Sequence, residues 1–376
     1  TDRKRTVRVE VGECSESDPS GVYSGSMSYN STLSPKPVGL LQRYGKDGDM
    51  HFGLLTGSYT NNISGGVLRK NLGSIEDEID QNTGEFTSSE GIIYTIDRLR
   101  IINFDYSNHE YDGGWYTAGP MSDSGAHFPD WGNPLAEMLY EGLRYYGGEA
   151  TPKFDYSGND GDELDLPQPD WQDPYNSTDY CAKAHILTIS DIYPTFDSDE
   201  VPGAKSGWRD SSFSSSENIG NAAEALDVKD IGDEIFNEEF GSSKNRFIGC
   251  SNSIVGDFSC SAKTVNSFGN IRGLCPDEPT KQGSYYSASV AHYARTNDMS
   301  SVQGNQTITN YMVGLSSPRP RIEIPVMDGK VTVVPFGKSV GGDYGISPDE
   351  EDDYQPTNTI VDYFVEDISP TRGSFR

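Results

Sequence analysis

Residues 181–200 have the sequence CAKAHILTISDIYPTFDSDE, in which a mostly apolar run, 184–190, leads directly into an acid, Asp191. The run shows no polar alternation, which predicts a strand buried on both faces in the middle of a parallel sheet. In such sheets ligands bind in the crevice at the carboxyl ends of the strands. Asp191 is therefore expected at a candidate ligand-binding edge, where it either holds a ligand or caps the loop that follows.

The elements predicted around this strand alternate between strands and helices. Residues 133–146, NPLAEMLYEGLRYY, carry apolar residues at three- and four-residue spacing, which predicts an amphipathic helix. Asn133 is a suitable N-cap, and Pro134 suits the first helical turn. Further strands are predicted at 50–59 and 307–316, and a second helix at 284–298. This alternation indicates an α/β protein with a mostly parallel sheet, in which the three strands are neighbours.

The remainder of the chain is richer in loops. Two long polar stretches, about 61–130 and 197–283, are expected to be insertions into the α/β domain. Residues 321–336 contain two alternating runs joined at Asp328-Gly329, a residue pair that favours a tight hairpin turn. A last strand is predicted at 359–367. The C-terminal part is therefore expected to be rich in β-structure.

Charge and hydrophobicity exclude two classes of partner. The 376 residues include 58 acids and 29 Lys or Arg, for a formal net charge of −29. Nucleic-acid binding is not expected, because the phosphate backbone requires the opposite sign. No run of about 18 apolar residues occurs, so the chain is not expected to span a membrane.

The cysteines suggest an oxidising compartment without a metal or haem motif. The five cysteines include no CxxC pair. Cys250 and Cys260 are spaced for a small disulfide loop. Disulfides persist mainly in secreted and periplasmic proteins, and this composition favours such an extracytoplasmic location.

Little in the sequence indicates catalysis. None of the five histidines lies in a nucleophile-type motif such as GxSxG. A secreted hydrolase that uses an acid pair near Asp191 stays open as an alternative, and it would require two converging carboxylates with raised pKa values. The aromatic, Gly-rich stretch 104–120 suits either a recognition loop or a long loop held to its own domain by its rings.

Two stretches resemble the von Willebrand factor A family, whose doubly wound sheet carries a divalent-metal site. Residues 133–146 resemble the helix at whose start that family has a metal-binding Thr, and Asn133 takes the Thr position. The segment ISDIYP, 189–194, resembles the strand end that supplies an acid, here Asp191. The resemblance implies Ca²⁺ or Mg²⁺, which take hard oxygen ligands. The family's DxSxS motif is missing, since YSGSMSYNS, 23–31, lacks the leading Asp.

A longer series of ordered blocks resembles the PilY family of secreted type IV pilus proteins. The blocks include KPVGLLQRYG, MHFGLLTGSY, WGNPLAEMLYEGLRYYGG, YCAKAHILTISDIYPT, PRPRIEIPVMDGKVTVVPFGKSVGG and QPTNTIVDYFVEDI. The resemblance implies a von Willebrand factor A-like domain over 1–316 and a β-rich connector over 317–376. It also implies that the chain is the middle of a longer protein, with a β-propeller beyond Arg376.

The same resemblance predicts the function. It implies an extracellular, pilus-associated assembly factor or tip adhesin on the cell surface, not an enzyme. The expected partners are minor pilins or another pilus-tip component, with a surface or host ligand as a further partner. A structural filament subunit of the same fold is the main alternative to this prediction.

Overall fold

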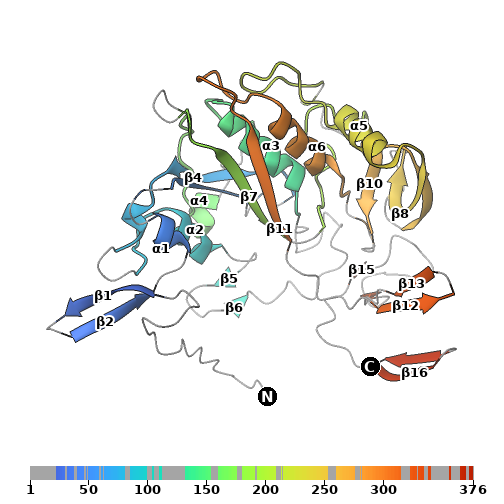
Figure 1. Cartoon of the computed structure of the whole chain (residues 1–376), viewed down its shortest axis with the longest axis horizontal. Coiled ribbons are helices and arrows are strands. Elements are labelled where there is room, and N and C mark those ends of the chain that lie inside the picture. The colour runs from blue at the N-terminus through green and yellow to red at the C-terminus, as the bar shows by residue number, and fades with distance from the viewer. Residues whose placement is uncertain are drawn as a thin grey trace. The chain divides into compact units, whose positions relative to one another are not determined.

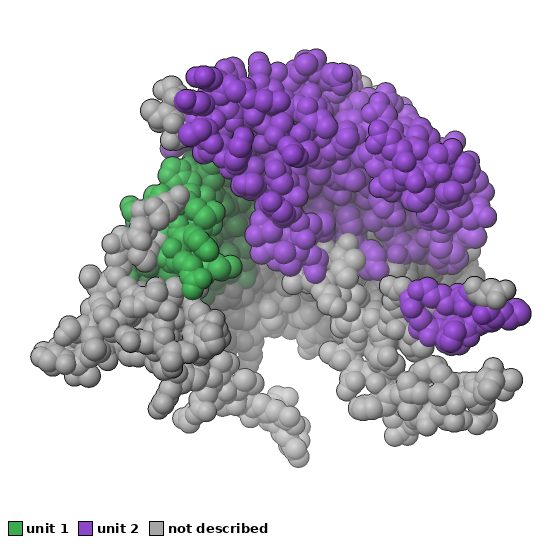
Figure 2. All heavy atoms as spheres, viewed as in Figure 1, with its two compact units in different colours: residues 1–55, 68–99, 161–170 green, residues 56–67, 100–160, 171–376 purple. Residues whose placement is uncertain are grey.

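The chain forms two compact units. The computed structural model describes residues 23–29, 32–37, 40–45, 48, 50–58, 61, 63–80, 85–99, 104–105, 110–111, 132–153, 160–175, 180–190, 193–208, 213, 215–252, 260–275, 280, 282–314, 322–327, 329–333, 338–339, 355–356, 365–369 and 372–375. Unit 1 comprises residues 1–55, 68–99 and 161–170, and unit 2 comprises residues 56–67, 100–160 and 171–376 (Figure 2).

Unit 1 is built around a small apolar core. Its elements are β1 (Tyr23–Tyr29), β2 (Thr32–Pro37), α1 (Leu40–Gly45), β3 (Phe52–Thr56), β4 (Val67–Gly73), a 3₁₀ helix (Glu76–Glu78) and α2 (Ile92–Arg98). β3 pairs with β4, and β1 pairs with β2. The core consists of Ile75, Ile79 and Ile92, against which Leu41 and Phe52 pack.

The centre of unit 2 is a pair of parallel strands, β7 (Ala184–Ser190) and β11 (Ile308–Gly314). In their register, Ile308 lies opposite Ala184 and Gly314 lies opposite Ser190. Figure 1 shows α3 (Leu135–Tyr146) and α6 (Tyr286–Thr296) side by side behind this pair. The Tyr146 hydroxyl at the end of α3 donates to the His185 carbonyl of β7 (3.3 Å). One face of the strand pair is therefore packed against helices.

A second core in unit 2 lies within the stretch predicted to be a loop-rich insertion. Here α5 (Val228–Phe240) is followed by the antiparallel strands β8 (Lys244–Ser251), β9 (Ser261–Val265) and β10 (Ile271–Leu274), in the order β10-β8-β9. Asp227 begins the helix, because its carboxylate accepts from the Asp230 N–H (2.9 Å). Gly241 ends it in a left-handed conformation (φ 61°). The buried residues of this core are Phe236, Ile248, Val265 and Ile271.

The other described elements are short. They are β5 (Phe104–Asp105), β6 (Glu110–Tyr111), α4 (Asp160–Leu164), β12 (Ile322–Val326), β13 (Gly329–Val333), β14 (Lys338–Ser339), β15 (Gln355–Pro356), β16 (Val365–Ser369) and β17 (Arg372–Phe375). β5 and β6, β12 and β13, β14 and β15, and β16 and β17 form antiparallel pairs.

The two predicted helices and two of the three predicted neighbouring strands are confirmed. α3, β7, α6 and β11 lie where the sequence predicts them, and β7 and β11 are neighbours. The prediction that 50–59 joins their sheet is wrong, because β3 pairs with β4 in a separate sheet. Elements that follow each other closely in the chain usually pair, and β4 is the next strand after β3.

The predicted hairpin is confirmed, but its turn lies one residue earlier than predicted. Val326 pairs with Gly329, so Gly329 already belongs to β13 and the turn precedes it. Met327 has a positive φ of 47°. Of the strand predicted at 359–367, residues 365–367 belong to β16 and the preceding six lie outside the described residues.

The predicted disulfide is wrong in one partner. Cys260 is bonded to Cys275, with 6.0 Å between their Cα atoms, and Cys250 is a buried cysteine of β8 outside this disulfide. Cys260 and Cys275 are next to the two strands that flank β8, just before β9 and just after β10. The fold therefore brings these two side chains together, while Cys250 lies opposite Arg272 in the register of β8 and β10.

Replacing both bonded cysteines, Cys260→Ser with Cys275→Ser, is expected to lower the free energy of unfolding. The bond closes a loop with a sequence separation of 15 residues. Loops of this size contribute about 3 kcal/mol by restricting the unfolded chain. Urea denaturation measures the change, and Cys181→Ser, at an exposed free thiol, is the control that should behave as wild type. A Cys250–Cys260 linkage in non-reducing peptide mapping would contradict the assignment.

Candidate functional site

Asn133 connects the start of α3 to the loop after β7. Its backbone N–H donates to Thr195 Oγ1 (2.7 Å), and its side-chain Nδ2 donates to the Tyr193 carbonyl (3.0 Å). Its Oδ1 accepts from the Ser190 hydroxyl (2.8 Å). Sequence reasoning correctly places Asn133 at the carboxyl end of β7, since Ser190 is the last residue of that strand.

The prediction that Asn133 caps the helix is wrong. α3 begins at Leu135, and Pro134 occupies the N-cap position without a side-chain capping bond. The Pro134 carbonyl accepts the first helical bond, from Met138 N–H (2.9 Å). The Asn133 side chain is unavailable for capping because its hydrogen bonds are made to the loop after β7 instead.

Asp191, the acid predicted to bind the metal, lies outside the described residues. The preceding residue, Ser190, contacts Asn133 through two side-chain oxygens, the ligand type that Ca²⁺ and Mg²⁺ require. However, Asn133 Oδ1 already accepts from Ser190, so it would have to exchange that contact for an ion. No group of three or more His, Cys, Asp or Glu in the described part of the chain is placed to hold a metal. The metal site at Asp191 and Asn133 stays a prediction.

A few residues further along the same loop, Asp197 is a completely buried carboxyl that contacts the beginnings of two helices. Its Oδ1 accepts from the Ser284 N–H (2.7 Å), just before α6, and the carboxyl also accepts from the backbone of Ala136 in α3. The Ser284 hydroxyl donates to the Asp197 carbonyl (3.1 Å) and accepts from the Tyr286 N–H (3.1 Å). Burial raises the pKa of the Asp197 carboxyl to about 7, although these bonds favour its charged form.

Glu137, in the first turn of α3, is a second completely buried carboxyl. It accepts from the Gly65 N–H (2.5 Å). Burial raises its pKa well above the ordinary value, and the nearby acids Glu200, Asp199 and Asp197 raise it further. One oxygen of Glu137 and one of Asp197 have no hydrogen-bond partner. The raised pKa values and the oxygens without a partner both suit carboxyls that carry their proton near neutral pH.

Two buried acids with raised pKa values are the feature that the hydrolase alternative requires. Here both Glu137 and Asp197 are completely shielded from solvent, so a substrate could not reach either carboxyl. Their hydrogen bonds go to the backbone of helix starts and of the loop before β4. These acids therefore organise the fold and do not form a substrate site.

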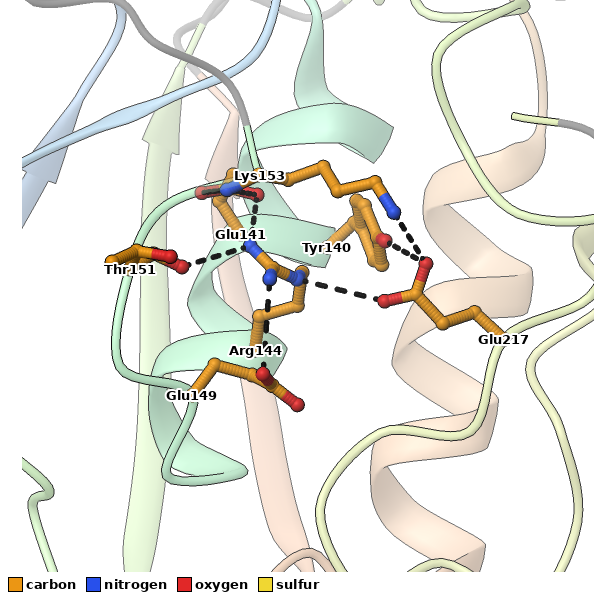
Figure 3. A network of polar contacts seen from close by, with 7 residues as sticks. All are labelled: Tyr140, Glu141, Arg144, Glu149, Thr151, Lys153 and Glu217. Atoms are coloured by element: carbon orange, nitrogen blue, oxygen red, sulfur yellow. Dashed lines mark hydrogen bonds and ion pairs between the residues drawn. The ribbon is translucent and has the colours of Figure 1, made fainter. Parts of the chain in front are cut away.

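The C-terminal half of α3 carries a buried ion-pair network (Figure 3). Glu141 Oε1 accepts from Arg144 Nη1 (3.1 Å) and from the Lys153 backbone N–H (3.1 Å). The same Arg144 nitrogen donates to the Thr151 carbonyl (3.2 Å). Burial raises the pKa of Glu141 to about 7, although the neighbouring Arg144 favours its charged form. The turn after α3 is thus held to the helix by charged groups.

Glu217 joins the same network from a different part of the chain. Its carboxylate accepts from the Tyr140 hydroxyl (2.8 Å) and from Lys153 Nζ (2.8 Å), and it lies 3.7 Å from Arg144 Nε. Burial, and then Glu217, raise the pKa of the Tyr140 hydroxyl strongly, so this hydroxyl keeps its proton and donates. The sequence predicts that Tyr140 and Arg144 lie on one helix. It gives no sign of their partner Glu217, which follows β7 by more than two dozen positions.

Fold and site together define an α/β protein whose buried charges hold helices and loops in place. The chain belongs to the PilY1 homolog family, as its resemblance predicts. A family model described as the second domain of PilY1 homologs matches residues 52–294, and a model of their β-sandwich matches residues 324–375.

One relative matches along nearly the whole chain. It is the type IV pilus biogenesis factor PilY1 homolog of Xylella fastidiosa (strain Temecula1), 39% identical over 388 residues. The match covers 98% of this chain and 25% of the relative, so the chain spans about a quarter of that protein's length. No solved structure matches the chain.

Stability is expected to fall as the pH rises from about 4 to 7, because the native state holds a proton on Asp197 that the unfolded state releases earlier. The folded pKa of about 7 lies above the ordinary value of 3.8, so the native state binds more protons between the two. Asp197→Asn keeps the accepting oxygen and should make this dependence less steep, while the raised pKa values of Glu137 and Glu141 keep part of it. Urea denaturation at several pH values measures it.

Glu238→Gln is the matched control, since Glu238 is exposed on α5 in the same unit. It should retain the wild-type dependence on pH. An Asp197→Asn protein whose stability still falls with pH as steeply as wild type would show that Asp197 is not a major titrating group.

Asp191→Ala is expected to abolish or weaken divalent-cation binding if Asp191 is a metal ligand. Calorimetric titration of Ca²⁺ and of Mg²⁺ into the full-length protein and its variant measures this directly. Carboxylate oxygen is the strongest ligand type available at this edge for either ion. Identical heats in the two proteins would leave Asp191 as a residue that caps the loop after β7.

Proposed function

We propose that this chain belongs to an extracellular, pilus-associated protein that acts in type IV pilus assembly or at the pilus tip. The observation that carries the proposal is the 39% identity, along 98% of the chain, to a protein named as a type IV pilus biogenesis factor. The proposed partners are minor pilins or another pilus-tip component. As a tip adhesin, the protein would also bind a surface or host ligand.

Two features of the molecule support a binding role outside the cytoplasm. The Cys260–Cys275 disulfide suits an oxidising compartment. The two acids that resemble a catalytic pair, Glu137 and Asp197, are buried and bonded to backbone groups. Among the described residues, no helix has the length and apolar character needed to cross a membrane.

The proposed framework for this role is a von Willebrand factor A-like sheet. The parallel pair β7 and β11, with α3 and α6 on one face, supports this proposal. The position of Asn133 at the carboxyl end of β7 supports it as well. Such sheets bind ligands at that end, so a partner is proposed to bind near the loop after β7.

Removing residues 52–294 in frame from the chromosomal gene tests the role in assembly. Surface pili, counted by electron microscopy, should be largely lost, because these residues contain both buried cores described above. Pilin in the sheared extracellular fraction should fall, while pilin inside the cells is retained. Immunoblots of the shortened protein, and restoration by a wild-type copy, are the controls.

Normal numbers of pili in the deletion strain would contradict a role in assembly. If those pili no longer attached to surfaces, the tip-adhesin function would stand alone. Normal pili with normal attachment would overturn both functions.

A further inference from the structure

One face of the β7–β11 pair is apolar and exposed. Leu187 and Ile189 of β7 are 60% and 65% exposed, and Tyr311 and Val313 of β11 are 56% and 48% exposed. Leu187 lies opposite Tyr311 in the register, and Ile189 lies opposite Val313, so the four side chains form one patch. This patch is called the outer face. The opposite face contains the buried Ala184 and Ile308 and packs against α3 and α6.

An exposed apolar face is unusual for parallel strands. Parallel sheets occur almost entirely with both faces covered, usually by helices. The residues of the outer face belong to an apolar run that, in the sequence, predicts burial on both sides. Within the described residues, β7 and β11 pair only with each other. A contiguous apolar patch of this kind marks a surface that another element covers.

The length of the relative indicates where that element comes from. The match uses 25% of the relative, so three quarters of that protein lies outside the region that corresponds to this chain. A second copy of the chain is a poor candidate, because two chains that each carry a formal charge of −29 repel each other.

We propose that, in the full-length protein, an amphipathic helix from outside residues 1–376 covers the outer face. Its apolar side packs against Leu187, Ile189, Tyr311 and Val313, and completes a sheet with helices on both faces. The β7–β11 pair is then an interface between this chain and the rest of its own polypeptide.

Thiol labelling of the full-length protein tests whether the outer face is covered. Leu187→Cys and Val313→Cys should react with a maleimide about tenfold or more slowly than Met327→Cys, since a covered thiol reacts only after local opening. Met327 is 98% exposed on a hairpin turn, and Ile308→Cys, at a buried position of β11, gives the rate for a covered site. Rates at 187 and 313 equal to the rate at 327 would overturn the proposal.

Photocrosslinking identifies the covering element independently. Benzoylphenylalanine replaces Tyr311 with a similar aromatic side chain, and mass spectrometry then locates the linked peptide. A link within one molecule to a peptide outside residues 1–376 is the expected result. A link to a second molecule, a link to a peptide within 1–376, or no link would each overturn the proposal.

Discussion

The carboxyl of Asp197 is the contact on which the arrangement of unit 2 depends most. It accepts from the backbone at the start of α3 and from Ser284 just before α6, so one side chain fixes both helices relative to the loop after β7. Burying a carboxyl is costly, and the backbone N–H groups at helix starts, with their partial positive charge, offset part of that cost. The loop is fixed again at Asn133, whose side chain bonds to Ser190 and Tyr193. The helices, the strand end and the loop therefore behave as one structural unit.

α3 extends this polar interior along its length. Glu137, Glu141 and Arg144 are all buried, although the helix also buries Leu135 and Leu143. Removing one partner of a buried ion pair leaves an unpaired charge at a large cost in stability, so Arg144, Glu141 and Glu217 depend on one another for their burial. Buried acids with raised pKa values often mark active sites. Here burial raises the pKa values, while the partners, which are backbone groups and Arg144, favour the charged forms, so the shifts require no catalytic role.

The sequence predicts the elements whose signals are local. The apolar run at 184–190 and the apolar spacing at 133–146 each correspond to one element, β7 and α3. The second core was missed even though Asp227 and Gly241 are good signals for the start and end of α5. Those signals lie in a stretch so rich in Ser and Asp that it resembles loop. Burial of Glu137 and Asp197 could not be predicted, because acids are almost always exposed and their partners here are distant in sequence.

The difference between predicted and observed burial of β7 is itself informative. Its sequence has the apolar character of a strand covered on both faces, yet the structure covers only the face that contains Ala184. Exposed apolar side chains at Leu187 and Ile189 gain nothing for an isolated domain and favour aggregation, so a pattern of this kind suits a longer polypeptide. The apolar sequence of β7 thus predicts contacts that the described residues do not supply. The relative is about four times as long as the region that matches this chain. This length supports the proposal that the strand pair belongs to a larger sheet structure and is not the edge of an independent domain.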